Sequence, residues 1–250
     1  MKKISLVIFD LSGTTVSDDN AVAKCLYEGA SHFGLKTTIG DFEKTIGTNK
    51  IRLYEFMIAR DQGEDVQIEN LEQYRFQRYH EKAMEIFRYY SILMINHYRK
   101  EVKAIPGAEE TFRWCHDNEI KVVTDTGFHR DVNNAIMEGL QWKEQGLIDF
   151  ALDVEHTGEI GRPAPYMIFK AMLMTGVQSV HEVIKIGDTP ADLLSGYNAG
   201  CRGNIGVLSG ANSAETLRVY PHTHIIDSVA DLPKLIIHEF SGSPYTLRIV

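Results

Sequence analysis

An aspartate at the end of an apolar stretch is the first residue of this sequence that could do chemistry. The stretch 4–9 is apolar or small throughout, and Asp10 is followed by the turn-forming residues Leu11-Ser12-Gly13-Thr14-Thr15. Such a short apolar stretch is typical of a strand buried on both faces of a parallel sheet. Reactive groups in open α/β sheets lie just beyond the carboxyl ends of such strands. Asp10 is therefore placed to act as a nucleophile or a metal ligand, although an aspartate that caps a turn explains this stretch equally well.

Further expected strand ends also carry polar groups. One is followed by Asp125-Thr126-Gly127, in which a hydroxyl and a glycine amide could hold phosphate oxygens. A later strand leads into Asp188 and Asp192, two carboxylates spaced so that both can face one site. Between them, Gly161-Arg162-Pro163 places a cation near the start of an expected helix. Each feature alone is common, but their order at successive strand ends makes a specific constellation.

The elements that must position these residues fall into two groups. No strand-like pattern occurs between about residues 20 and 100, and helices are expected there at 20–33, 41–47 and 50–60, with two more over 68–100. After residue 100 strand and helix patterns alternate, with strands expected at 120–124, 150–154, 183–186, 204–207 and 224–226 and a last helix near 229–239. This alternation predicts an α/β fold, a doubly wound parallel-sheet (Rossmann-like) core with an inserted all-helical cap domain. We expect residues 1–15 and 101–250 to form the core and residues 16–100 the cap.

Composition and charge limit the classes of partner. The chain has 250 residues, 44% of them hydrophobic, which is ordinary for a soluble globular protein. A net charge of −8 argues against nucleic acid or an anionic membrane as partner, but not against a small anionic substrate. No stretch approaches the roughly 20 apolar residues of a membrane span. The cysteines fit neither a disulfide framework nor a zinc site, so we expect a cytoplasmic protein with reduced thiols at Cys25, Cys115 and Cys201.

The strand-end constellation resembles that of the haloacid dehalogenase-like superfamily of phosphotransferases, over almost the whole chain. The resemblance implies that Asp10 attacks phosphorus and forms an aspartyl-phosphate. It also implies that Thr126 and the amide of Gly127 hold phosphate oxygens. Arg162 stands where these enzymes usually carry lysine, and it would balance charge between the nucleophile and the phosphate.

The same resemblance implies a cofactor, Mg²⁺. Asp10, the backbone carbonyl of Ser12 and Asp188 would bind the ion, and Asp192 would order its surroundings. The electrostatics agree, because an anionic nucleophile must meet an anionic substrate and a divalent cation offsets their repulsion.

Ser12 departs from the usual pattern of the superfamily. Most of its phosphatases carry a second aspartate at this position, which protonates the leaving group and then activates water. A serine hydroxyl is too weak an acid for that task, so either the enzyme is impaired or its leaving group is activated in another way. The phosphonatase branch, phosphonoacetaldehyde hydrolase and its phosphonatase-like relatives, has a small residue here. The sequence resembles that branch in Gly13-Thr14-Thr15-Val16 and in the arginine of Gly161-Arg162-Pro163.

In that branch a lysine of the cap forms a Schiff base with the substrate aldehyde, so the carbon leaves phosphorus as an enamine. The segment Ile46-Gly47-Thr48-Asn49-Lys50-Ile51 is similar to the Gly-x-x-Lys-Ile segment of the branch, which implies this role for Lys50. A solvated lysine on a helix is the alternative. Phosphonatase proper has methionine, histidine and cysteine around its Schiff-base lysine where this chain has Ile46, Leu53 and Asn20, and Phe128 replaces a tyrosine beside the phosphate-binding threonine. The aldehyde pocket is therefore expected to be less polar.

The resemblance gives three functional hypotheses. The first is a Mg²⁺-dependent hydrolase that cleaves the C–P bond of phosphonoacetaldehyde or a related 2-oxoalkyl phosphonate. The second is a phosphatase or phosphotransferase acting on small phosphate monoesters, with Lys50 only binding substrate. The third is a binding protein that kept the fold without catalysis, against which the intact Asp10 speaks.

Two features stay open between structure and function. His129 and Arg130 follow the Thr-Gly pair and either contact the substrate or only begin the next helix. An aromatic run at helical spacing is expected to pack within the cap, or to form a homodimer through it, rather than to bind bases. Its members are Tyr74, Phe76, Tyr79, Phe87, Tyr89 and Tyr90.

Overall fold

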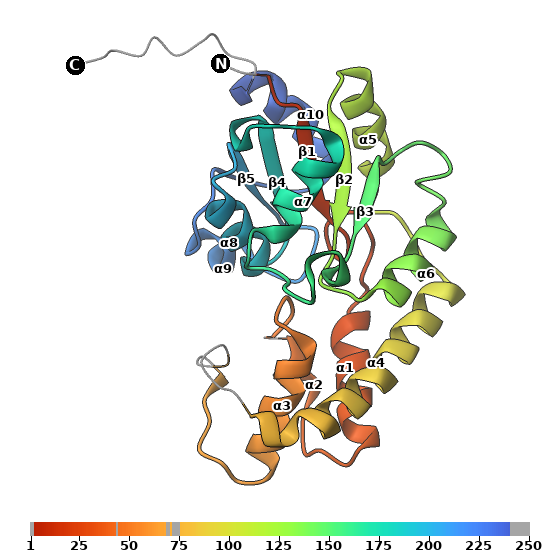
Figure 1. Ribbon diagram of the computed structural model, residues 1–250, viewed down its shortest axis with the longest axis vertical. Coiled ribbons are helices and arrows are strands. Elements are labelled where there is room, and N and C mark those ends of the chain that lie inside the picture. Colours follow the sequence, from red (N-terminus) through yellow and green to blue (C-terminus); the bar gives the residue numbers. More distant parts are fainter. Residues whose placement is uncertain (1–2, 44, 69–70, 72–75, 241–250) are drawn as a thin grey trace, which may run out of the picture.

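The computed structural model, which describes residues 3–43, 45–68, 71 and 76–240, contains a six-stranded sheet with helices on both faces (Figure 1). The strand order is β3-β2-β1-β4-β5-β6, and every neighbouring pair is parallel. The expected doubly wound parallel sheet is confirmed. The strands are β1 (Leu6–Asp10), β2 (Lys121–Asp125), β3 (Phe150–Leu152), β4 (Val183–Gly187), β5 (Gly203–Val207) and β6 (His224–Ile226).

Helices connect the strands, and four of the described α-helices lie within residues 16–100. Those four are α1 (Ala21–His32), α2 (Ile39–Glu43), α3 (Lys50–Asp61) and α4 (His80–Lys100). The others are α5 (Ala108–Asp117), α6 (Arg130–Leu140), α7 (Tyr166–Thr175), α8 (Pro190–Ala199), α9 (Ala214–Arg218) and α10 (Leu232–Leu235). Short 3₁₀ turns are η2 (Gln77–Tyr79), η3 (Val154–Thr157), η4 (Val180–Glu182) and η5 (Val229–Asp231), and a π-helical turn, η6 (Ile236–Phe240), follows α10.

Strand β1 lies in the middle of the sheet and is buried along its whole length. Leu6 and Ile8 belong to the apolar cluster that contains Ile168 of α7. On the opposite face Phe9 packs edge-to-face against Phe112 of α5, with 5.0 Å between the ring centroids. Because neighbouring residues of a strand point to opposite faces, an apolar stretch without alternation is what this doubly covered position requires. Asp10 is thereby fixed at the carboxyl end of the central strand.

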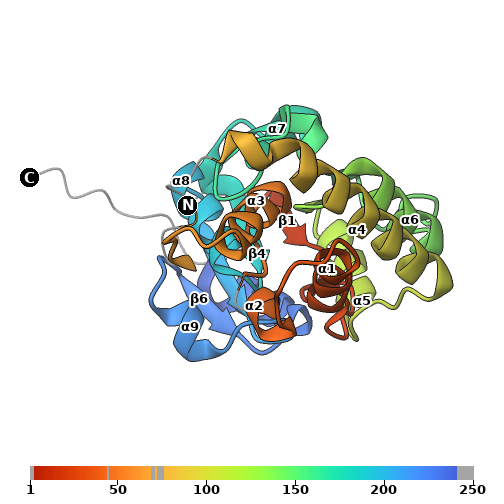
Figure 2. The same cartoon turned by 90° about the horizontal axis from the view of Figure 1, so that it is seen from below.

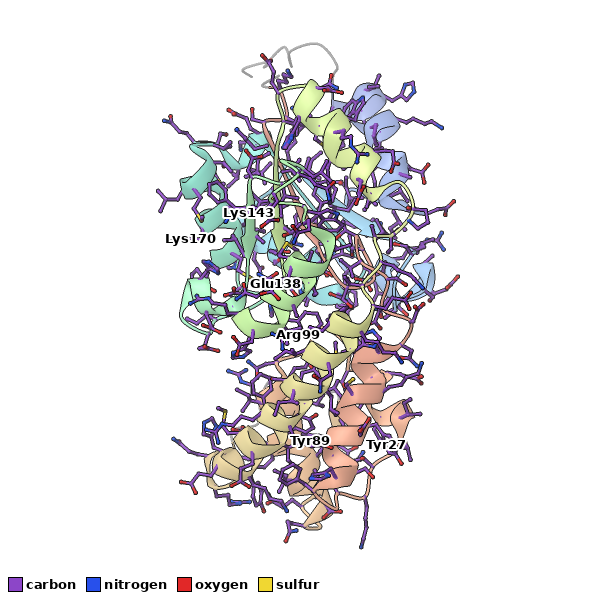
Figure 3. All side chains as sticks on the ribbon, turned by 90° about the vertical axis from the view of Figure 1, so that its right-hand side faces the viewer. Tyr27, Tyr89, Arg99, Glu138, Lys143 and Lys170 are labelled. Carbon is purple, nitrogen blue, oxygen red and sulfur yellow. The ribbon has the colours of Figure 1, made fainter. Side chains whose placement is uncertain are left out.

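Helices α1 to α4 form a helical segment beyond the carboxyl ends of the strands (Figures 1 and 2). The long helix α4 packs against α1 and α3 and, near its other end, against α6 of the sheet part, which Figure 3 shows from the side. Buried apolar side chains of the helical segment and of one face of the sheet form one continuous cluster. The division into a core of residues 1–15 and 101–250 and a cap of residues 16–100 stays a prediction.

Two expected helical stretches differ from the structure. Within the described part of 68–100 a single α-helix, α4, is present instead of two, and residues 69–70 and 72–75 lie outside the described residues. The last expected helix, 229–239, is divided into η5, α10 and η6. Pro233 is in the first turn of α10, a position that suits proline because its missing N–H needs no partner there.

The aromatic residues of the cap pack mostly among themselves. Phe87 and Tyr90 are buried, and Tyr89 stacks on His32 at 4.2 Å between ring centroids. Tyr27 and Tyr89 lie on the face of the helical segment that is turned to the viewer in Figure 3. A homodimer through this segment stays a prediction, and Tyr74 lies outside the described residues.

The cysteines are unpaired, as expected. Among the described helices, none combines the length and the apolar character that a membrane crossing needs.

Candidate active site

The strand ends bring most of the predicted residues to one small cavity. Strands β2, β1 and β4 are neighbours, so the residues that follow their carboxyl ends meet at one edge of the sheet. The loop before α7 brings Arg162 there, and its Nη1 donates to Oδ1 of Asp10 at 2.7 Å. The cavity has a volume of about 50 Å³ and is called the inner cavity below. Its lining includes six predicted site residues: Asp10, Ser12, Lys50, Thr126, Gly127 and Arg162.

Asp188 is not part of the inner-cavity lining and is held by the loops that follow β1 and β5. Its Oδ1 accepts from Oγ1 of Thr14 at 3.1 Å, and its Oδ2 accepts from the backbone N–H of Ala211 at 2.9 Å. Gly13 has a φ of +85°, and a Cβ atom there would lie 2.6 Å from Oδ2 of Asp188. Glycine is therefore required for both backbone conformation and close approach. Burial, reinforced by the charge of Asp192, raises the pKa of Asp188 to about 6.

Asp10 and Asp192 share Arg162 as a partner. Arg162 donates to both carboxylates, and the hydroxyl of Thr189 donates to Oδ2 of Asp192 at 2.5 Å. Burial raises the pKa of Asp10 well above its usual value, because Arg162 offsets only part of the desolvation. Burial also opposes ionisation of Asp192, but Arg162 and Lys185 outweigh it and hold the pKa of that carboxyl at about 2.

Buried carboxyl groups outnumber the cations that contact them at this edge of the sheet. Among the described residues of the cluster there are four carboxyl groups and two cations in contact with them. The carboxylates are Asp10, Asp125, Asp188 and Asp192, and the cations are Arg162 and Lys185. Oxygens of Asp10, Asp125 and Asp192 lie within 4.8 Å of one another, and Oδ2 of Asp125 has no hydrogen-bond partner. A cluster of hard oxygen donors of this kind could hold a metal ion.

Lys185 is a member of this cluster that the sequence interpretation missed. Its side chain is fully buried, and its Nζ lies 2.7 Å from Oδ1 of Asp125 and 2.8 Å from Oδ1 of Asp192. A lysine flanked by Ile184 and Ile186 in a strand buried on both faces was the available signal. An unpaired lysine is almost never buried, so a carboxylate partner had to be close.

The turn before α3 brings Lys50 to the inner cavity. Gly47 has a φ of +96°, and a Cβ there would lie 3.2 Å from Cβ of Thr189, so this turn lies directly on the sheet part. The side chain of Asn49 accepts from the backbone N–H of Arg52 at 3.1 Å and caps α3. Lys50 is thus the first residue of the helix, with its Nζ donating to the carbonyl of Thr48 at 3.0 Å.

The electrostatic surroundings of Lys50 lower the cost of its neutral form. Burial and the charge of Arg162 lower the pKa of Lys50 to about 8, although Asp18 and Asp10 act in the opposite direction. An amine with a lowered pKa is what nucleophilic attack on a carbonyl needs, because only the neutral form carries a free electron pair.

Ser12, which stands where a second aspartate is expected, has no acidic group of its own. Its Oγ donates to Oδ1 of Asp18 at 2.9 Å, and the hydroxyl of Tyr98 donates to Oγ of Ser12 at 3.4 Å. Burial raises the pKa of Asp18. The contact with Asp18 could not be predicted, because nothing in the sequence neighbourhood of Asp18 shows that the chain folds back onto Ser12.

Thr126 is held in the loop after β2, and only two of the four residues that differ from phosphonatase proper line the inner cavity. The N–H of Thr126 donates to the carbonyl of Leu152 at 3.0 Å, and its Oγ1 accepts from the N–H of Phe128 at 3.2 Å. Ile46 and Phe128 line the inner cavity, which supports the expected loss of polarity. Leu53 is fully buried, and Asn20 donates to Glu43 instead. Neither is part of the inner-cavity lining.

Comparison with known proteins places this geometry in a family. A family model described as haloacid dehalogenase-like hydrolase matches residues 4–200. Phosphonoacetaldehyde hydrolase from Bacteroides fragilis is 24% identical to this chain over 258 residues, covering all of this chain and 94% of its own length.

Solved structures share the fold at lower identity. A structure named provisionally as a phosphoglycolate phosphatase, from Lactobacillus delbrueckii, superposes with a TM-score of 0.75 at 20% identity, covering 96% of this chain and 100% of its own. A phosphonoacetaldehyde hydrolase-like protein from Oleispira antarctica gives a TM-score of 0.71 at 22% identity, covering 94% of this chain and 92% of its own. At these identities the two structures establish a common fold and do not choose between their activities.

Proposed function

This chain belongs to the haloacid dehalogenase-like hydrolase family, and from that premise we propose that it cleaves the C–P bond of phosphonoacetaldehyde or a related 2-oxoalkyl phosphonate. The observation that carries the proposal is the shared lining of the inner cavity. A carboxylate nucleophile, Asp10, and an amine with a lowered pKa, Lys50, face the same space. Ser12 stands where a phosphate-ester hydrolase of this family would need an acid.

The amine acts first on the carbonyl group. Neutral Lys50 attacks the carbonyl carbon, a C–N bond forms, and the oxygen leaves as water to give a protonated imine. This iminium group withdraws electrons from the neighbouring C–P bond. No acid is then needed at a leaving oxygen, which agrees with a serine at position 12.

The carboxylate then acts on phosphorus. Oδ of Asp10 forms a bond to phosphorus while the C–P electron pair moves into the iminium and produces an enamine. Arg162, Thr126 and the amide of Gly127 hold the phosphoryl oxygens during this transfer. The enamine carbon takes up a proton from water, and hydrolysis of the resulting imine frees Lys50 and the carbonyl product. A second water hydrolyses the aspartyl-phosphate and releases inorganic phosphate.

The donor set at the strand ends fits Mg²⁺ as the cofactor. Asp10, the carbonyl of Ser12 and Asp188 would hold the ion, with Asp192 ordering its surroundings. When bound, the ion would offset the repulsion between Asp10 and an anionic substrate.

The proposal is tested by borohydride reduction in the presence of Mg²⁺ and phosphonoacetaldehyde, followed by peptide mapping. We expect a reduced adduct on Lys50 and release of inorganic phosphate when borohydride is omitted. Lys50→Arg should lose the adduct and at least roughly 10³-fold in kcat/KM, because guanidinium stays protonated and forms no imine. Lys24→Arg is the matched control, since Lys24 is exposed on α1 and should keep both properties.

A phosphate-monoester phosphatase or phosphotransferase is the second candidate, and one contact favours it. The half-buried carboxyl of Asp18, whose pKa is raised, is hydrogen-bonded to Ser12, which stands where the acid is expected. If no lysine is labelled while phosphate monoesters are hydrolysed, this second function replaces the first.

The lowered pKa of Lys50 gives the first reaction a characteristic pH dependence. Only neutral Lys50 attacks, and with a pKa of about 8 roughly a tenth of it is neutral at pH 7 and about nine-tenths at pH 9. We therefore expect kcat/KM for phosphonoacetaldehyde to rise roughly tenfold between pH 7 and pH 9. Initial rates at saturating Mg²⁺ measure this, and a flat profile over that range would contradict the role of Lys50 as the attacking amine.

A further inference from the structure

A second and larger cavity adjoins the inner one. It has a volume of about 290 Å³ and is called the outer cavity below. The two cavities share five lining residues: Gly47, Thr48, Lys50, Gly127 and Arg162. An inner cavity of about 50 Å³ has little room beyond a phosphoryl group, so the rest of any substrate must extend toward the outer cavity.

Lys50 lies at the boundary between the two cavities, and this position decides which part of a substrate extends outward. An imine carbon bonded to Nζ of Lys50 carries two further substituents. One is the CH₂ group that leads to phosphorus, which must lie inward beside Asp10. The other is hydrogen in an aldehyde and carbon in a ketone, and it is directed toward the outer cavity.

The outer cavity offers apolar surface to such a substituent. Phe87 of α4, Val154 of η3 and Ile160 are part of its lining. Ile160 is 49% exposed, so an apolar ligand would cover a side chain that is now in contact with water. Polar side chains also line the cavity, among them Arg52, His129 and Glu159, and the side chains of His129 and Glu159 lie 3.4 Å apart.

We propose that the outer cavity binds an apolar substituent on the carbonyl carbon, so that the preferred substrate is a 2-oxoalkyl phosphonate with an alkyl chain and not phosphonoacetaldehyde. This inference rests on the proposed function. The bonds made and broken are those given above. The products are inorganic phosphate and a methyl ketone, whose methyl carbon takes its new hydrogen as a proton from water.

A chain-length series tests the inference with the electrophile held constant. Rates of phosphate release are measured with Mg²⁺ for 2-oxopropyl and 2-oxohexyl phosphonate, and phosphonoacetaldehyde serves as the reference. Each fully buried methylene contributes roughly fourfold, so three of them should raise kcat/KM by up to roughly sixtyfold. Ala164→Phe, which narrows the outer cavity, should remove most of this increase. Leu173→Phe, on the solvent face of α7 where Leu173 is 78% exposed, should keep it.

The outcomes separate the inference from the function on which it rests. If phosphonoacetaldehyde is cleaved and kcat/KM is flat or falls with chain length, the inference is wrong and the proposed function stands. If the increase persists unchanged in Ala164→Phe, the substituent binds elsewhere and the inference is also wrong. If none of the three compounds releases phosphate, the proposed function is wrong and the inference with it.

Discussion

Asp10→Asn lowers kcat/KM for phosphonoacetaldehyde by roughly 10⁴-fold or more, the loss expected when a covalent nucleophile is removed. An amide has nearly the shape of a carboxylate, but its oxygen is far too weak a nucleophile to displace carbon from phosphorus. The same loss is expected for phosphate monoesters, because either enzymatic function uses this carboxylate.

The fold should survive this substitution. Burial raises the pKa of Asp10 well above its usual value, so the ionised carboxylate is disfavoured in the folded state and a neutral amide relieves that penalty. We therefore expect a thermal midpoint at neutral pH no lower than that of the wild type. Asp131→Asn, at an exposed position of α6, is the matched control and should leave both activity and stability unchanged. Turnover within tenfold of wild type in Asp10→Asn would exclude the aspartyl-phosphate.

The parts of the site that follow strand ends could be predicted from the sequence, and the physical reason is topological. Parallel strands present their carboxyl ends at one edge, so any chemistry-bearing residue that follows a buried strand arrives at the same place. Asp10, Thr126 and Asp188 needed no knowledge of side-chain contacts for this. The strand periodicity that locates them is also the strongest local signal in the chain.

Contacts between the helical segment and the sheet could not be predicted in this way. The hydrogen bond from Ser12 to Asp18 depends on how the chain turns after β1. The close approach of Gly47 to Thr189 brings together residues that are 142 positions apart in the sequence. Alignment alone also placed Leu53 and Asn20 beside the aldehyde. The structure puts one in the apolar interior and pairs the other with Glu43. A local sequence pattern predicts that a segment is helical, but it does not predict which other elements each face of the helix contacts.

The role of Lys185 could not be predicted from periodicity, because the pattern shows Lys185 only as one residue of an apolar strand. The structure makes it the sole hydrogen-bond donor to the side chain of Asp125 among the described residues, since Oδ2 of Asp125 has no partner. Lys185 also lies 2.8 Å from Oδ1 of Asp192, the oxygen that Arg162 contacts as well. Removing the ammonium group of Lys185 leaves the negative charges of Asp125 and Asp192 less neutralised in buried surroundings of low dielectric constant.

We therefore expect Lys185→Met to lower the free energy of unfolding by about 3–5 kcal/mol, the range found when one member of a buried ion pair is deleted. Urea denaturation at neutral pH measures the loss. Lys121→Met is the matched control, because Lys121 pairs with Asp149 at the exposed start of β2 and should cost less than about 1 kcal/mol.

A second substitution separates charge from packing. Asp125→Asn in the Lys185→Met background removes the carboxylate that was left unpaired, so part of the lost stability should return. Loss of packing alone predicts no recovery, since methionine fills the strand interior equally well in both variants. An unchanged unfolding free energy in Lys185→Met, or a double variant that is weaker still, would show that the buried lysine does not neutralise Asp125. Recovery of the unfolding free energy would mean that Lys185, which does not contact the substrate, stabilises the buried carboxylates next to Asp10.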